Sequence, residues 1–155
     1  MSPQQSKRPG EIAVEHPQAS DAWLQYIGRI HTPWQRREEC PRQGDLDGPE
    51  CQIEVFQPWD RALVGLQTTT PLEVLYWLDQ SRRDLVLQCP TGRDHPVGTF
   101  ALRSPVRPNP IGSSVVELIG IEGQVLRVRG LDCLDGTPLL DLKPARSVFM
   151  TNPRT

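Results

Sequence analysis

The sequence lacks the groupings of cysteine and histidine that hold metal ions or form disulfide frameworks. Its four cysteines are scattered, no two form a C-x-x-C pair, and none of the three histidines lies at ligand spacing from a cysteine. Signatures of a cysteine nucleophile or of a phosphate-binding Walker loop are also absent. We therefore expect no metal site, and we expect reduced, partly buried thiols. The cysteines are Cys40, Cys51, Cys89 and Cys133.

Long hydrophobic runs are missing as well. No apolar stretch approaches the roughly 20 residues that a membrane-spanning helix needs, and the N-terminus has no basic-then-apolar secretory pattern. The resulting expectation is a cytoplasmic protein without a membrane segment. Neither sign of charge dominates, since the formal net charge is −2. This balance argues against indiscriminate binding of nucleic acid but leaves room for a local basic patch.

The length of 155 residues suits one domain with one hydrophobic core. Residues 1–24 are polar, contain proline and show no hydrophobic period, so we expect a flexible N-terminal tail there. The domain itself is expected over residues 25–150, with no C-terminal accessory domain. Residues 34–50 are charged and rich in proline and glycine, and they are predicted to form a long loop.

Several short apolar or alternating stretches predict β-strands. A hairpin is expected where the turn residues Glu122-Gly123 separate two of these strands. Many short strands of this kind favour an all-β barrel or sandwich, mainly antiparallel. The predicted strands cover residues 26–30, 51–56, 85–87, 115–121, 125–131 and 139–142.

One short helix is predicted to be inserted among these strands. Thr70 is a suitable N-cap, Pro71 fits the first turn, and Glu73 completes a capping box with Thr70. An apolar stripe at helical spacing follows, and two arginines suit the C-terminal end of the helix dipole. The stripe is Leu72, Leu75, Tyr76 and Leu78, and the arginines are Arg82 and Arg83.

One face of the predicted hairpin carries positive charge. On the returning strand of the hairpin, Arg127 and Arg129 share one face, which is either a cationic ligand surface or an ordinary solvated face.

After this strand, an Asp-Gly turn predicts a positive φ angle at Gly136. Asp132 and Asp135 beside it are available to bind a ligand hydroxyl or amine, or to accept hydrogen bonds from their own backbone amides.

The segment Arg-Ser-Pro-Val-Arg-Pro-Asn-Pro-Ile-Gly, residues 103–112, contains three prolines within six residues. Each proline fixes its own φ angle and pushes the preceding residue out of the helical region. We therefore expect a stiff, extended ribbon that presents two arginines and Asn109. This ribbon is either a ligand wall or a rigid surface turn.

This proline-rich segment, together with Gly-Leu-Asp-Cys-Leu-Asp-Gly-Thr-Pro-Leu-Leu-Asp-Leu-Lys-Pro at residues 130–144, resembles the TsaA-like (YaeB-like, TrmO) family. Ile27-Gly28-Arg29-Ile30, Thr32-Pro33 and Pro41-Arg42-Gln43-Gly44 also match. The resemblance covers residues 25 to about 144, and it is loose over residues 50–95.

The resemblance implies a compact β-barrel that binds S-adenosylmethionine, forms a homodimer and methylates N6 of threonylcarbamoyl-adenosine at position 37 of tRNA. Because the methyl donor is already activated, catalysis is expected to consist mainly of positioning, and no catalytic residue is assigned. The tentative substrate contacts are Arg107, Asn109 and Lys143. By analogy the cofactor would be held by Pro41, Arg42, Gln43, Asp79, Gln80, Arg103, Val115, Asp132, Cys133, Leu134 and Asp135.

Some positions depart from the family pattern. Pro71 and Glu73 replace a histidine and a tryptophan, Asp79 stands where related chains often have histidine, and Ala145 stands where tyrosine usually follows Lys-Pro. Two other functions therefore remain open. One is an enzyme that uses S-adenosylmethionine to methylate a small molecule, and the other is a non-catalytic module that binds this cofactor.

Overall fold

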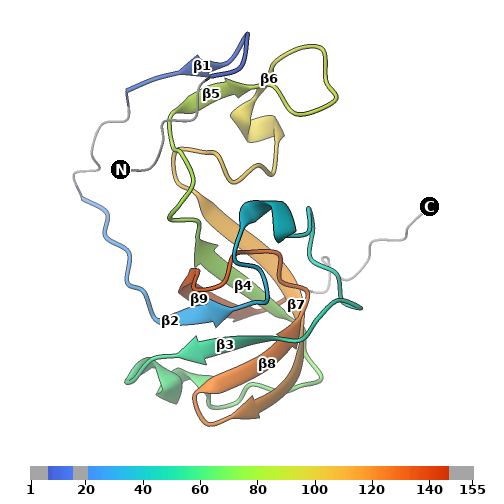
Figure 1. Ribbon diagram of the computed structural model, residues 1–155. Helices are drawn as coiled ribbons and strands as arrows, with labels where there is room; N and C mark the ends of the chain where they lie inside the picture. Colours follow the sequence, from blue (N-terminus) through green and yellow to red (C-terminus); the bar gives the residue numbers. More distant parts are fainter. Residues whose placement is uncertain (1–6, 16–20, 147–155) are drawn as a thin grey trace. The chain divides into compact units, whose positions relative to one another are not determined.

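The computed structural model describes residues 7–15 and 21–146, and these fold as two compact units (Figure 1). The larger unit comprises Trp23–Asp79 and Ile111–Thr155, and the smaller unit comprises Met1–Ala22 and Gln80–Pro110. The smaller unit is therefore built from the N-terminal segment and from a stretch inserted between two strands of the larger one.

The larger unit is a closed antiparallel barrel of six strands, in the order β2-β3-β8-β7-β4-β9 (Figure 1). This architecture confirms the prediction of an all-β, mainly antiparallel barrel. The predicted hairpin is present, with Gly123 at φ 62° in its turn. The strands are β2 (Gly28–His31), β3 (Cys51–Val55), β4 (Leu72–Trp77), β7 (Ile111–Glu122), β8 (Val125–Arg129) and β9 (Pro138–Pro144).

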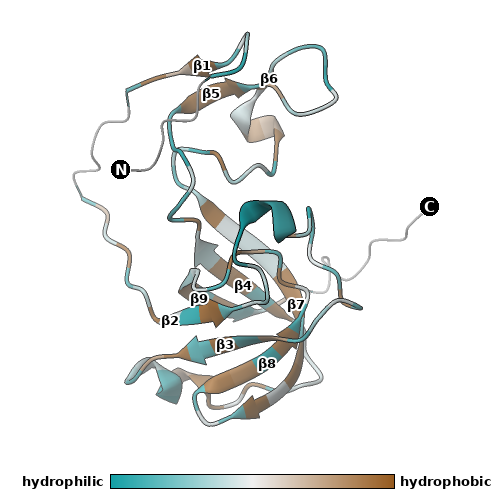
Figure 2. Ribbon diagram, in the orientation of Figure 1, coloured by the Kyte–Doolittle hydropathy of each residue, from teal (hydrophilic) through white to brown (hydrophobic). Residues whose placement is uncertain are grey.

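The core of the barrel is formed by side chains at every second position of its strands, as the pleat of a strand requires. Ile30, Ile53, Leu126 and Val128 are all fully buried, whereas the residues between them are more exposed. Figure 2 shows this alternation as hydrophobic and hydrophilic bands along β3 and β8. As predicted, Leu126 and Val128 face inward and the arginines of β8 face outward.

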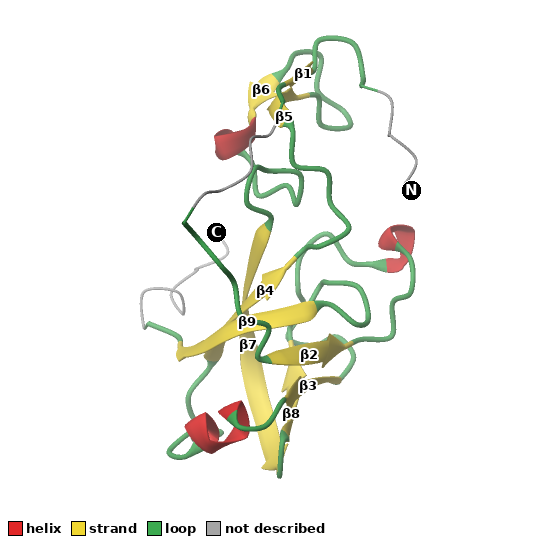
Figure 3. Cartoon of the chain, turned by 90° about the vertical axis from the view of Figure 1, so that its left-hand side faces the viewer, coloured by secondary structure: helices red, strands yellow, loops and turns green. Residues whose placement is uncertain are grey.

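The predicted helix at residues 70–82 is wrong, because Leu72–Trp77 form strand β4 (Figure 3). Leu72, Val74 and Tyr76 are buried at a spacing of two, and β4 pairs with both β7 and β9. The apparent helical stripe arose because leucines also occupy positions on the outer face of the strand. Pairing of β4 along both of its edges overrides the local capping signals. In the described part of the chain, the helical segments are the short 3₁₀ turns Arg37–Glu39, Trp59–Leu63 and Thr99–Ala101.

The smaller unit contains a three-stranded sheet in the order β1-β5-β6, formed by Ile12–Ala13, Leu85–Gln88 and Val97–Gly98. Strand β1 lies in the segment for which we expected a flexible tail, so that expectation is wrong for these two residues. A strand of two residues has no hydrophobic period, and its partner β5 lies far away in the sequence. Within the described ranges, no helical segment has the length and hydropathy that a membrane-spanning helix requires.

Candidate functional site

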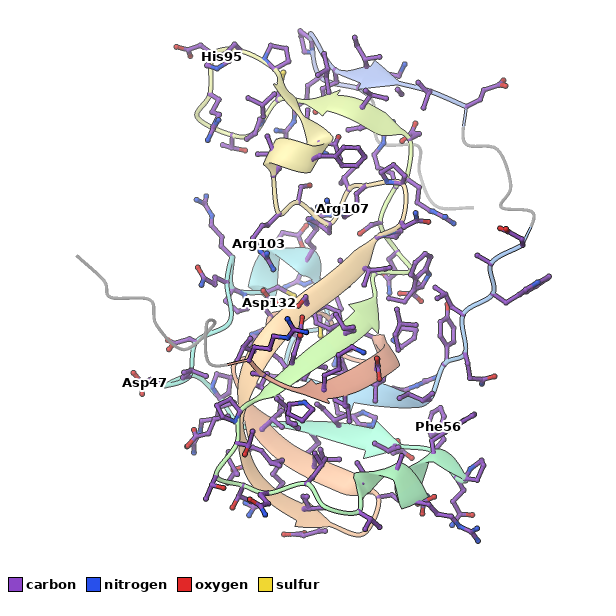
Figure 4. All side chains as sticks on the ribbon, turned by 180° about the vertical axis from the view of Figure 1, so that it is seen from behind. Asp47, Phe56, His95, Arg103, Arg107 and Asp132 are labelled. Carbon is purple, nitrogen blue, oxygen red and sulfur yellow. The ribbon has the colours of Figure 1, made fainter. Side chains whose placement is uncertain are left out.

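Asp132 lies in the loop that follows β8 (Figure 4). Two buried hydroxyl groups of the barrel hold its carboxylate. The Tyr76 hydroxyl donates a hydrogen bond of 2.7 Å to Asp132 Oδ1, and Ser114 Oγ lies 3.4 Å from the same oxygen. Ser114 Oγ is also 2.8 Å from the Tyr76 hydroxyl. Both hydroxyls contact Oδ1, so Oδ2 is the oxygen of this carboxylate that a ligand could use.

Tyr76 acts in this cluster as a neutral hydrogen-bond donor. Burial and the nearby charge of Asp132 raise the pKa of the Tyr76 phenol well above its usual value. The barrel also leaves a space for the tyrosine ring, because a Cβ atom at Gly112 would overlap it. Gly112 ends the proline-rich motif, so the glycine in that motif serves to seat the side chain that orients Asp132.

Asp135, three residues further on, anchors the loop to the end of β2. Its Oδ1 accepts a hydrogen bond of 3.0 Å from the Thr32 backbone N–H, and its Oδ2 accepts one of 3.2 Å from Gln35 Nε2. Gly136 has a φ of 80°, as predicted from the Asp-Gly turn. Burial raises the pKa of Asp135, but the hydrogen bonds from Gln35 and Thr32 and the nearby His31 ring outweigh it, so the pKa is lowered overall.

The loop at residues 41–44 packs directly against the start of this aspartate-bearing loop. A Cβ atom at Gly44 would overlap the Gly130 carbonyl oxygen, so the two backbones approach more closely than any other residue would allow. Burial and the charge of Asp132 raise the pKa of the Cys40 thiol, which precedes the 41–44 loop. Two motifs that are far apart in the sequence therefore meet on the barrel.

A shallow hollow opens beside this junction of the two loops. Arg42 and Gln43 are exposed on the 41–44 loop, so their side chains are accessible to a ligand. The hollow combines one indole ring, prolines and carboxylates, which suits a ligand with both apolar and cationic parts. It is lined by Trp34, Glu39, Pro41, Asp45, Gly48, Pro49 and Leu131.

The other predicted site residues of the barrel unit have varied surroundings. Cys133 is buried, and burial raises the pKa of its thiol to about 12. Its carbonyl accepts a hydrogen bond from Thr32 Oγ1, so Cys133 fixes the loop rather than presenting a reactive thiol. Leu134 and Val115 are half-buried, and Asp79 is exposed after β4. Lys143 forms an exposed ion pair of 2.8 Å with Asp141.

Four predicted residues, Gln80, Arg103, Arg107 and Asn109, belong to the smaller unit. Gln80, Arg103 and Asn109 are exposed. Arg107 is half-buried, and its Nη1 donates to the carbonyls of Leu102 and Ser104 at 3.0 and 3.2 Å. Arg107 therefore braces its own loop, whereas the sequence predicted a contact with substrate.

Sequence reasoning missed Tyr76 and Ser114 as site residues. Tyr76 was assigned to the apolar stripe of a helix, and Ser114 was given no role. Alternation of Leu72, Val74 and Tyr76 was the available signal for a strand, because it places the tyrosine inside the sheet. The described residues contain no group of three or more histidine, cysteine, aspartate or glutamate side chains arranged to hold a metal ion.

Comparison with known proteins identifies the family of this fold. Residues 29–149 match the tRNA-methyltransferase O N-terminal domain. A probable S-adenosyl-L-methionine-binding protein VirR of Rhizobium radiobacter is 51% identical over 141 residues, which cover 91% of this chain and 81% of that protein. A tRNA (adenine(37)-N6)-methyltransferase of Escherichia coli K12 is 33% identical over 132 residues, or 78% of this chain and 56% of that enzyme.

A solved structure agrees with these sequence matches. The crystal structure of TrmO from Pseudomonas aeruginosa superposes with a TM-score of 0.68 at 32% identity, covering 88% of this chain and 61% of that one. This chain thus spans less than two thirds of the crystallised protein and of the Escherichia coli enzyme. Since the family match extends over most of the sequence, the chain belongs to the family of the tRNA-methyltransferase O N-terminal domain.

Proposed function

We propose that this chain binds S-adenosylmethionine and transfers its methyl group to N6 of threonylcarbamoyl-adenosine at position 37 of tRNA. The names of two relatives support the two halves of the proposal, since one is called a probable S-adenosyl-L-methionine-binding protein and the other a tRNA (adenine(37)-N6)-methyltransferase. The single observation that carries it is the Asp132 carboxylate, whose Oδ1 is held by the hydroxyls of Tyr76 and Ser114.

The residues at this junction fit the proposed cofactor. Asp132 Oδ2 suits a ribose hydroxyl or an ammonium group, because an ionised carboxylate accepts hydrogen bonds from both. The exposed Arg42 guanidinium suits the carboxylate of the methionine part, and Arg103 is the alternative for this role. The remaining proposed contacts are Pro41, Gln43, Asp79, Gln80, Val115, Cys133, Leu134 and Asp135.

Bound S-adenosylmethionine supplies an activated methyl group, so the chain itself needs little acid–base chemistry. The hydrogen bonds of Tyr76 and Ser114 hold Asp132 in one orientation before any ligand binds. Asp135 and the close approach of Gly44 to Gly130 hold the surrounding backbone. Such preorganisation favours the near-attack geometry that methyl transfer requires, which is worth roughly 7–11 kcal/mol at best.

Calorimetry with S-adenosylmethionine tests the cofactor site. We expect Asp132→Asn to weaken binding about tenfold or more, because one charge-assisted hydrogen bond contributes roughly 1.5–3 kcal/mol. Asp141→Asn is the matched control, since Asp141 is an exposed carboxylate of the same barrel that pairs with Lys143. Equal affinities for the wild type and the Asp132 variant would contradict the assignment.

Methyl transfer to tRNA with and without the threonylcarbamoyl group tests the acceptor. Transfer to the modified tRNA alone would support the full proposal. Transfer to neither would favour the second candidate, an enzyme that methylates a small molecule. One observation favours that candidate: the barrel unit has ten arginine and lysine residues against fourteen aspartate and glutamate residues, a net charge of −4.

We further propose that the protein is a cytoplasmic homodimer, in line with the family resemblance. Sedimentation equilibrium of the full chain tests the oligomeric state. A monomer at micromolar concentration would contradict this part of the proposal while leaving the cofactor site untouched.

A further inference from the structure

Positive charge is concentrated in the inserted segment of the smaller unit. Gln80–Pro110 carries five arginines against two aspartates, a net charge of +3, whereas the barrel unit carries −4. A segment with a net positive charge attracts a polyanion, and it does so without the whole protein being basic. The arginines are Arg82, Arg83, Arg93, Arg103 and Arg107, and the aspartates are Asp84 and Asp94.

Ion pairs engage cations in both units. Arg127 lies 3.2 Å from Glu50 and 3.4 Å from Glu122, and Lys143 lies 2.8 Å from Asp141. Arg127 and Lys143 are therefore balanced locally, and so is Arg82 of the smaller unit, which lies 2.7 Å from Asp84. The candidate for contact with an anionic partner is the inserted segment with its net charge of +3, on which Arg93 is exposed.

A large aromatic side chain is exposed in the same segment. Phe100 is 82% exposed, on the one-turn 3₁₀ helix Thr99–Ala101. Thr99 beside it is buried, and its hydroxyl donates to the Leu85 carbonyl at 2.7 Å and accepts from Gln88 Nε2 at 2.9 Å. The backbone under Phe100 is thus held in place while the ring faces solvent.

Arginine and an exposed aromatic ring together are the combination that binds single-stranded nucleic acid. Aromatic rings stack on unpaired bases, and guanidinium groups bind phosphates in a bidentate manner. Arg93 lies on the exposed loop between β5 and β6, where Gly92 has a φ of 85°. A purely apolar partner would not bind the arginines, and a purely anionic partner would not stack on the aromatic ring.

We infer that the smaller unit is the RNA-docking element of this chain, with Phe100 stacking on an unpaired base and Arg93 binding phosphate. This inference rests on the proposed function, because it assigns the grip on a tRNA substrate to residues 80–110. It also removes the argument against a tRNA substrate that the net charge of −4 of the barrel unit provides. Most of the proposed cofactor contacts lie in the barrel unit, whereas Phe100 and Arg93 of the smaller unit would hold the RNA.

Binding of an anticodon stem-loop RNA to the full chain, measured by fluorescence anisotropy at several salt concentrations, tests the inference. We expect Phe100→Ala to weaken binding by about 5- to 150-fold, the range for loss of one stacked base. Arg93→Gln is expected to reduce the salt slope by about 0.7. Trp59→Ala and Arg61→Gln are matched controls, because they remove an exposed ring and an exposed arginine from the barrel unit.

Two further readouts separate the possible failures. Polyphosphate has charge but no bases, so Phe100→Ala should leave its binding unchanged, and an equal loss would overturn the stacking role. If the wild type methylates tRNA while Phe100→Ala and Arg93→Gln bind RNA normally, the inference fails and the proposed function stands. If the wild type methylates no tRNA yet both substitutions weaken RNA binding, the proposed function fails and the docking surface stands.

Discussion

The two units of this chain are held together by different interactions. The barrel unit has a continuous apolar core that draws on all six strands. In the smaller unit, only four of the described residues are buried, and two of them, Gln88 and Thr99, are polar. Gln88 Nε2 donates to Thr99 Oγ1 and to the Val106 carbonyl at 2.9 and 2.7 Å. The barrel is stabilised mainly by hydrophobic burial, whereas a small hydrogen-bonded centre organises the other unit.

This difference separates the two tasks that the proposals assign to the chain. A packed core keeps carboxylates and hydroxyls in fixed positions, which suits a cofactor site. A small polar centre stabilises less, but it leaves most side chains of its unit on the surface. Those side chains are available for contact with a large, charged partner.

The largest expected effect comes from truncating the apolar core. Ile53→Ala should lower the free energy of unfolding of the barrel by about 2–5 kcal/mol, because Ile53 is fully buried and a cavity would remain. Leu85→Ala should instead reduce hydrogen-exchange protection mainly in residues 80–110. Equal loss of protection across both units in the Leu85 variant would show that they unfold as a single cooperative block.

An intermediate effect is expected from removing one buried hydroxyl in each unit. Tyr76→Phe and Thr99→Val should each cost about 1–3 kcal/mol, because each leaves buried polar partners unsatisfied. Only Tyr76→Phe should also weaken S-adenosylmethionine binding in calorimetry, since it releases Asp132. The comparison between the units would break down if Thr99→Val weakened cofactor binding as much as Tyr76→Phe does.

The smallest effect is expected at Asp135 and depends on pH. Because its pKa is lowered from the ordinary 3.8, ionised Asp135 stabilises the folded barrel above that value. The stabilisation should disappear as the pH falls through the lowered pKa. Asp135→Asn should remove this pH dependence and cost about 0.5–1.5 kcal/mol at neutral pH. Thermal melts between pH 2 and pH 7 measure both, and a variant that melts in parallel with the wild type would contradict the prediction.

The barrel strands were predictable where the local pattern and the final environment agree. Residues 51–56 and 125–131 alternate in polarity because one face is buried, so their periodicity reports their location directly. Residues 70–82 have the local signals of a helix, a capping box and spaced leucines, whereas β4 is stabilised by pairing with β7 and β9. Strand β1 was undetectable, since two residues carry no period.

The candidate site likewise has a part that the sequence predicts and a part that it does not. The Asp-Gly turn, the positive φ of Gly136 and the roles of glycine in tight turns follow from backbone sterics, which a short stretch of sequence specifies. The sequence does not predict the close approach of Gly44 to Gly130, because this approach depends on how the closed sheet brings separate loops together.

By itself, the sequence determined that this chain is mainly β, which residues alternate across its sheets, and which motifs are candidates for a site. Only the tertiary structure decided that Tyr76 and Ser114 lie beside Asp132, and that Arg107 braces its own loop. The physical reason is range: steric and hydrophobic preferences act between neighbours in sequence, whereas hydrogen bonds between distant strands form only after the barrel has closed.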